Sequence, residues 1–120
     1  MRQLLFTIAR WKIVGRLIGW VFEHMPNLLP VKRILETDNL LVFEHPKPVY
    51  ALHLLIIPKK AISDFSKVDG DSEIWKQLPA VVASLVKKFN LQNDGYRLIT
   101  NVGEYQEVAQ LHFHLVSDKQ

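Results

Sequence analysis

Six residues near the carboxyl end of the chain, Gln110 to Leu115, alternate between polar and apolar side chains. Successive side chains of a β-strand point to opposite faces of its sheet, so this alternation predicts a strand with one apolar face against a core. The opposite face then carries Gln110, His112 and His114. Two imidazoles about 6–7 Å apart on one sheet face are not explained by core packing. We therefore interpret this polar row as a candidate functional site.

Three roles for the two histidines stay open from the residues alone. With a third ligand such as His53, they could bind a metal ion, since zinc takes imidazole ligands. They could instead be hydrogen-bonded imidazoles on a half-exposed sheet face that carry no chemistry. The third role is nucleophilic or acid–base catalysis, because imidazole titrates near neutral pH and can attack phosphorus or carry protons.

The composition limits the classes of protein and partner. The 120 residues suffice for one domain with its own core, and the absence of cysteine excludes disulfides, thiol nucleophiles and thiolate zinc sites. The net charge of +3 is unevenly distributed, because residues 1–33 carry six bases and one acid and residues 34–120 are slightly acidic. A nucleic-acid-binding domain usually carries positive charge on its folded body, so we expect no nucleic acid partner.

Residues 3–24 are predicted to form a helix with an apolar stripe and basic residues opposite it. The stripe consists of residues at helical spacing: Leu4, Ile8, Trp11, Ile18 and Phe22. Either this helix packs on its own domain or on a dimer partner, or it lies on an anionic membrane surface. No uncharged run approaches the roughly 20 residues that cross a bilayer. We expect a basic amphipathic helix at 1–25, a domain at 26–120 and a cytoplasmic protein, peripheral on the inner membrane surface under the second interpretation.

The remaining patterns predict an α+β fold. Strands are predicted at residues 31–36, 40–43, 53–57, 96–101 and 107–116. The run 53–57 is almost continuously apolar, which is typical of a central strand covered on both faces. A long helix is predicted after Asp71 or Ser72, and Pro79 within its apolar pattern indicates a kink or a later start. With a short helical turn at 61–68, these elements predict an antiparallel sheet of about five strands with one long helix packed on it.

Four blocks of the sequence follow a shared order and spacing. They are Val42-Phe43 with the proline loop after it, His53 to Lys60, Gly95 to Leu98 leading to Asn101-Val102-Gly103, and Gln106-x-Val108-x-Gln110-x-His112-x-His114. This arrangement resembles the histidine triad (HIT) superfamily over residues 18–117. The branch that it resembles most is that of the small nucleoside phosphoramidases.

The resemblance implies a hydrolase that cleaves a nucleoside phosphoramidate or a nucleotidyl ester or anhydride through a covalent nucleotidyl-histidine. His112 matches the nucleophile, and a backbone carbonyl would hold the proton on its other ring nitrogen. His114 matches the histidine that donates to a phosphate oxygen, and His53 matches the residue that supports the signature strand. The positions that match or replace nucleotide- and phosphate-binding residues are Asn101, Phe43, His45 and Glu107. The resemblance further implies a nucleotide-derived small molecule as ligand, a homodimer, and no cofactor or metal.

The chain departs from the family pattern at several of these positions. Gln110 replaces the first signature histidine, but an amide can donate and accept hydrogen bonds and so keep a supporting role. Glu107 replaces a serine, and its carboxylate would repel a phosphate by about 1–4 kcal/mol. His45 replaces the acid at the ribose position, and Tyr105 replaces a glycine. These departures leave a second hypothesis open, a non-catalytic nucleotide-binding or scaffolding protein of the same fold.

Overall fold

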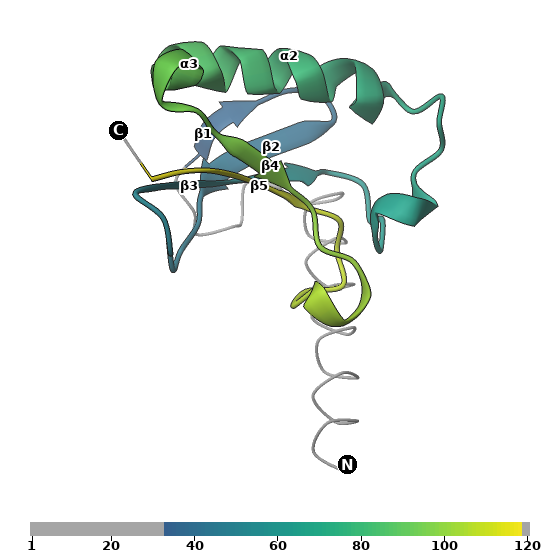
Figure 1. Ribbon diagram of the computed structural model, residues 1–120. Helices are drawn as coiled ribbons and strands as arrows, with labels where there is room; N and C mark the ends of the chain where they lie inside the picture. Colours follow the sequence, from purple (N-terminus) through teal and green to yellow (C-terminus); the bar gives the residue numbers. More distant parts are fainter. Residues whose placement is uncertain (1–32, 119–120) are drawn as a thin grey trace, which may run out of the picture.

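A five-stranded antiparallel sheet and one long helix on its face make up the described part of the protein (Figure 1). The computed structural model describes residues 33–118, so the helix predicted at 3–24 lies outside the described residues. The α+β prediction is confirmed. Among the described residues no helix is long and apolar enough to cross a membrane.

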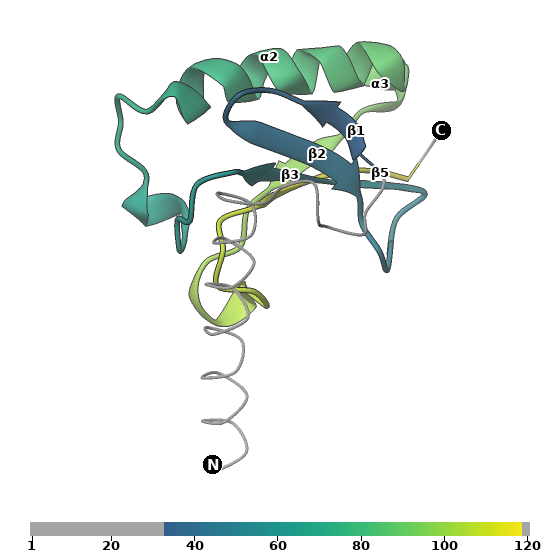
Figure 2. The same cartoon turned by 180° about the vertical axis from the view of Figure 1, so that it is seen from behind.

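The sheet has the strand order β1-β2-β3-β5-β4. Its strands are β1 (Arg33–Glu36), β2 (Leu40–Glu44), β3 (Leu52–Pro58), β4 (Arg97–Ile99) and β5 (Phe113–Ser117). The helices are α2 (Glu73–Lys88) and the short α3 (Leu91–Asp94), and two 3-10 turns are η2 (Phe65–Lys67) and η3 (Gly103–Tyr105). Seen from behind, β1 and β2 form one side of the sheet and β4 lies on the far side of β5 (Figure 2).

Strand β3 is the central strand that its apolar run predicted. All seven of its residues are buried, and it pairs with β2 on one side and β5 on the other. Its Leu52, Leu54 and Ile56 belong to the core beneath α2. The helix contributes one apolar face to that core: Ile74, Leu78, Val81, Val82, Leu85 and Val86. The intervening residues of β3 therefore face the side of the sheet away from α2.

Helix α2 begins where its capping residue predicts. The Ser72 hydroxyl accepts a hydrogen bond from the Ile74 amide at 3.3 Å, and the helix starts at Glu73. The alternative of a later start is wrong, because Pro79 lies inside the helix. Pro79 is on the exposed side, so the carbonyl that loses its amide partner there can be hydrated.

The last strand is shorter than predicted. Strand β5 starts at Phe113, and residues 107–112 are irregular instead of extending the strand back to Glu107. The neighbouring strands explain this difference, because their pairing with β5 ends at Ile56 of β3 and Ile99 of β4. Residues before Phe113 therefore have no strand to pair with in the described part of the chain. Beyond the last pairs the Thr100 hydroxyl donates to the carbonyl of His112 at 2.9 Å. A side-chain hydrogen bond thus replaces the backbone hydrogen bonds of the sheet at this point.

We expect the replacement Ser72→Ala to lower the free energy of unfolding by about 0.5–2 kcal/mol, because the first turn of α2 loses the acceptor for an otherwise unpaired amide. Urea denaturation followed by circular dichroism measures the change. The control is Ser84→Ala, the same replacement at an exposed position inside α2. An equal loss in both variants would contradict a specific role for the cap.

Candidate functional site

Four histidines gather on the sheet face away from α2. His53 lies on β3, His114 on β5, His112 just before β5, and His45 just after β2. The ring centroids of His114 are 5.1 Å from His53 and 5.0 Å from His112. The His45 ring stacks on His53 at 4.2 Å and lies 5.9 Å from His114. We call these four side chains the histidine cluster.

The alternation of the sheet places the cluster. Leu111, Phe113 and Leu115 belong to the core beneath α2, as the polar–apolar pattern predicted. His114 therefore faces the other side of the sheet, opposite Leu55 in the register of β3 and β5. His53 is offset by two positions, opposite Val116, which brings it diagonally within reach of His114 on the same face.

A chain of hydrogen bonds fixes the tautomers of two rings. The backbone amide of Val49 donates to His53 Nδ1 at 3.2 Å, so the proton of neutral His53 is on Nε2. His53 Nε2 is 2.8 Å from His114 Nδ1 and donates to it. The proton of neutral His114 is then on Nε2, which is a donor toward a bound group.

His112 has the opposite arrangement. Its Nδ1 lies 2.6 Å from the carbonyl oxygen of Gln110. A carbonyl only accepts, so Nδ1 carries the proton and Nε2 presents a lone pair. The carbonyl partner expected for His112 is thus present. The cluster offers one nucleophilic nitrogen beside one hydrogen-bond donor.

The pKa values favour these neutral tautomers. Burial and, to a smaller extent, positive charge on the neighbouring histidines lower the pKa of His114 to about 4. Burial also lowers the pKa of His53, with a smaller effect of positive charge on His45. The pKa of His45 is lowered by burial and raised in part by the charge of Glu107. These three rings are therefore uncharged at neutral pH.

Gln110 supports the backbone instead of facing a ligand. Its side chain is buried, with 2% exposed, and its Oε1 accepts from the Ile62 amide at 3.1 Å. Its Nε2 donates to the carbonyls of Lys60 at 2.9 Å and Pro58 at 3.3 Å. The side-chain amide therefore connects the segment just after β3 to the segment just before β5. It does not face a ligand beside His112, as the predicted polar row would require.

The other predicted site residues differ in burial and in surroundings. Phe43 is 6% exposed and packs in a small apolar cluster on β2 and β3, so little of its ring is open to a ligand. Asn101 is partly buried and follows Thr100, which bonds the His112 backbone. Glu107 is exposed in the irregular segment before β5, within electrostatic reach of His45.

His45 is the residue whose contacts the sequence analysis did not foresee. Its amide donates to the His53 carbonyl at 2.9 Å, and its Nδ1 accepts from the Lys47 amide at 3.0 Å. The feature of the sequence that could have indicated these contacts is the proline loop between β2 and β3. In an antiparallel hairpin, residues just outside the paired strands lie side by side, which brings position 45 to position 53.

One group of histidines within the described range could hold a metal ion. Ring nitrogens of His45, His53 and His114 all lie within 4.8 Å of one another. This set replaces the one considered from the sequence, since it contains His45 in place of His112. A metal held by His53 Nε2 and His114 Nδ1 would break the hydrogen bond between these two nitrogens.

Known proteins share this arrangement of elements. A family model described as HIT domain matches residues 28–120. An uncharacterized HIT-like protein of Helicobacter pylori is 37% identical over 100 residues, covering 81% of this chain and 94% of that protein. A solved HIT family hydrolase from Legionella pneumophila has 33% identity and a TM-score of 0.74, covering 82% of this chain and 91% of its own. A histidine triad nucleotide-binding protein from Candida albicans has 26% identity and a TM-score of 0.72, covering 84% of this chain and 75% of its own.

We expect the stability of the protein to fall between pH 7 and pH 4. The pKa of His114 is about 4 in the folded chain and near 6.5 when unfolded, so protons bind preferentially to the unfolded chain across this window. With solvent screening of a partly exposed ring, the free energy of unfolding decreases by about 1–2 kcal/mol. Urea denaturation at intervals of one pH unit measures this decrease.

The variant His114→Asn removes the titrating group and should show a shallower dependence on pH. The remaining slope comes from the other groups, including His53 and His45. An identical slope in both proteins would contradict the assignment to His114.

Proposed function

The chain belongs to the HIT family, and on this premise we propose that it hydrolyses a nucleotide derivative through a covalent intermediate on His112. One observation carries the proposal. A ring nitrogen with a free lone pair lies beside a ring with a fixed proton, as the hydrogen bonds of His112 and His114 require. A phosphoryl group needs this combination, a nucleophile for phosphorus and a donor for its oxygen.

In the proposed first step, His112 Nε2 attacks the α-phosphorus of the substrate. A bond forms between this nitrogen and phosphorus, and the bond from phosphorus to the departing nitrogen or oxygen breaks. The departing atom keeps the electron pair and takes a proton from water. His114 Nε2 donates to a phosphoryl oxygen as negative charge develops there.

In the second step, water adds to phosphorus and the bond to His112 breaks. The electron pair returns to Nε2, and the protons of the water pass to solvent. The Gln110 carbonyl holds the Nδ1 proton of His112 in both steps, which stabilises the positive charge of the phosphorylated ring. The released product is a nucleoside monophosphate.

The other members of the cluster serve to position His114. The Val49 amide fixes the tautomer of His53, and His53 fixes that of His114. The stacked ring of His45 restricts the rotation of His53. Asn101 is the candidate for a further contact to the phosphate, since it follows Thr100 beside the His112 backbone.

We expect His112→Ala to reduce the hydrolysis of nucleoside 5′-phosphoramidates by roughly a thousandfold or more, because the covalent route is lost. Rapid-quench mass spectrometry of the wild-type protein should detect a mass increase equal to one nucleotidyl group, and His112→Ala should lack it. The control variant is His45→Phe, which keeps a ring stacked on His53 and should retain the adduct.

Calorimetry with the nucleoside monophosphate product separates this proposal from the non-catalytic alternative. Nucleotide binding without turnover, and without an adduct for any phosphoramidate or dinucleoside polyphosphate, would favour the alternative. Loss of turnover on addition of a chelator would instead favour a metal-dependent reaction.

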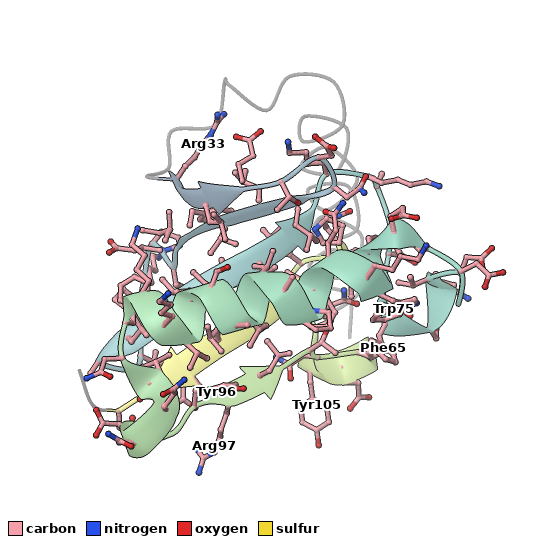
Figure 3. The ribbon with its side chains drawn as sticks, turned by 90° about the horizontal axis from the view of Figure 1, so that it is seen from above. Arg33, Phe65, Trp75, Tyr96, Arg97 and Tyr105 are labelled. Carbon is pink, nitrogen blue, oxygen red and sulfur yellow. The ribbon has the colours of Figure 1, made fainter. Side chains whose placement is uncertain are left out.

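We further propose that two copies of the chain pair along β4. This strand lies at the end of the sheet, where its backbone groups have no partner strand on one side within the described range. Exposed apolar residues flank that edge, with Tyr96 45% and Leu98 40% exposed. Figure 3 shows Arg97 and Tyr105 projecting outward beyond β4. Pairing of two such edges would bury these side chains and join the two sheets.

We expect Leu98→Asp to shift the protein from dimer to monomer, because two carboxylates would meet in the joined edge. Analytical ultracentrifugation over a concentration series measures the shift. Val49→Asp is the control, since Val49 is 77% exposed and lies in the loop between β2 and β3, outside the sheet edge. A wild-type protein that stays monomeric at all concentrations would contradict the proposal.

A further inference from the structure

Three imidazoles of the histidine cluster have the spacing that a transition metal ion requires of its ligands. Ring nitrogens of His45, His53 and His114 lie within 4.8 Å of one another. The nitrogen ligands of a tetrahedral zinc ion lie about 3.3 Å apart, since each is about 2.0–2.1 Å from the metal. Small movements of the rings would bring the three nitrogens to this separation. The positions of the ring protons therefore decide whether a metal binds.

The proline loop (residues 45–51) between β2 and β3 determines these proton positions in two of the rings (Figure 1). The backbone amide of Lys47 donates to His45 Nδ1 at 3.0 Å. The backbone amide of Val49 donates to His53 Nδ1 at 3.2 Å. A ring nitrogen that accepts a hydrogen bond carries no proton, so the proton of each neutral ring is on Nε2. Each ring therefore has an N–H group, instead of a lone pair, at the nitrogen that a metal would use.

A metal would require the opposite tautomer of both rings. Metal-bound histidines normally donate their second ring N–H to a carbonyl, a carboxylate or water. If His53 Nε2 bound a metal, the ring proton would be on Nδ1 and would point at the amide hydrogen of Val49. The same conflict would arise between His45 and Lys47. Each amide would also lose its acceptor, which costs free energy. His114 differs, because its Nδ1 already has a lone pair.

Rotation of the His53 ring does not remove this conflict. The residue is buried, with 7% exposed, and its ring contacts the stacked ring of His45 at 4.2 Å and the edge-on ring of Tyr50 at 5.5 Å. Its Nε2 is also 2.8 Å from His114 Nδ1. A half-turn of the ring would replace both nitrogens with C–H groups and break both hydrogen bonds. The tautomer of His53 is therefore fixed together with its orientation.

We propose that the proline loop disfavours the binding of transition metals, because its amides at Lys47 and Val49 hold two histidines in tautomers that cannot act as ligands. These histidines are His45 and His53. The inference is independent of the proposed function, since it concerns only the protons of the protein without substrate. Its consequence is that His114 stays free of metal and keeps its own hydrogen bond to His53.

The test removes the two amide donors by replacing Lys47 and Val49 with proline, which has no backbone N–H. Both positions have a negative φ, as proline requires, because Asn90 is the only residue other than glycine with a positive φ in the described part of the chain. We expect Lys47→Pro and Val49→Pro each to increase the affinity for Zn²⁺ about tenfold, and the double variant about a hundredfold. Isothermal titration calorimetry with Zn²⁺ alone measures these affinities.

The matched controls are Lys47→Ala and Val49→Ala. They remove the same side chains but keep both amides, so they should bind Zn²⁺ as weakly as the wild-type protein. Adding His45→Phe to the double proline variant should abolish the gain, because one of the three ligands is lost. A gain that persists in this triple variant would place the metal elsewhere and would overturn the inference.

The remaining outcomes also decide the inference. Equal affinities of the wild-type protein and the double proline variant would overturn it, and so would the absence of Zn²⁺ binding in both, because the amides would then not limit the affinity. If the proline variants do not fold, long-range ¹H–¹⁵N spectra of the wild-type protein provide the decision. They should show the proton on Nε2 of His45 and His53, and a proton on Nδ1 of either ring would contradict the proposal.

Discussion

The hydrogen bond from His53 Nε2 to His114 Nδ1 spans 2.8 Å between β3 and β5. It turns the outer nitrogen of His114 into a donor, and it exists only in one register of the two strands. In that register, Leu55 lies opposite His114, and His53 lies opposite Val116. A slip of either strand by one residue would move its imidazole to the core face beneath α2 and replace it with a leucine or phenylalanine side chain. The packing of apolar side chains against α2 therefore determines the chemistry on the other face.

The shortened strand β5 also determines which ring nitrogen of His112 carries the proton. In a regular strand the carbonyl of Gln110 would take an amide of a neighbouring strand. Because the ladder ends at Phe113, this carbonyl is free to accept from His112 Nδ1. The buried amide of Gln110 holds the segment in place through the backbone of residues 58–62. The loss of regular structure just before β5 is thus what leaves the outer nitrogen of His112 unprotonated.

Much of the fold follows from short-range patterns, and the exceptions have a physical reason. Strand β3 was predictable because its residues form an almost continuous apolar run, and helix α2 because its apolar residues repeat every three to four positions. The start of β5 was not, since residues 110–112 continue the polar–apolar alternation of the strand although no neighbouring strand of the described sheet pairs with them. The role of Gln110 depends on contacts 48 to 52 residues away in the chain, and no local pattern encodes such contacts. For His112 and His114, periodicity indicated a site, and the family resemblance supplied their separate roles.

In the proposed reaction, the uncharged state of His45, His53 and His114 has a consequence for the release of the product. Arginine and lysine hold a phosphate by full charges, and such ion pairs retain a dianionic product as firmly as they capture a substrate. Neutral rings hold it only by the dipoles of their N–H bonds, which are weaker for an ion surrounded by competing water. Under the proposed mechanism, a monophosphate formed against His114 would therefore dissociate readily and would inhibit the protein only weakly.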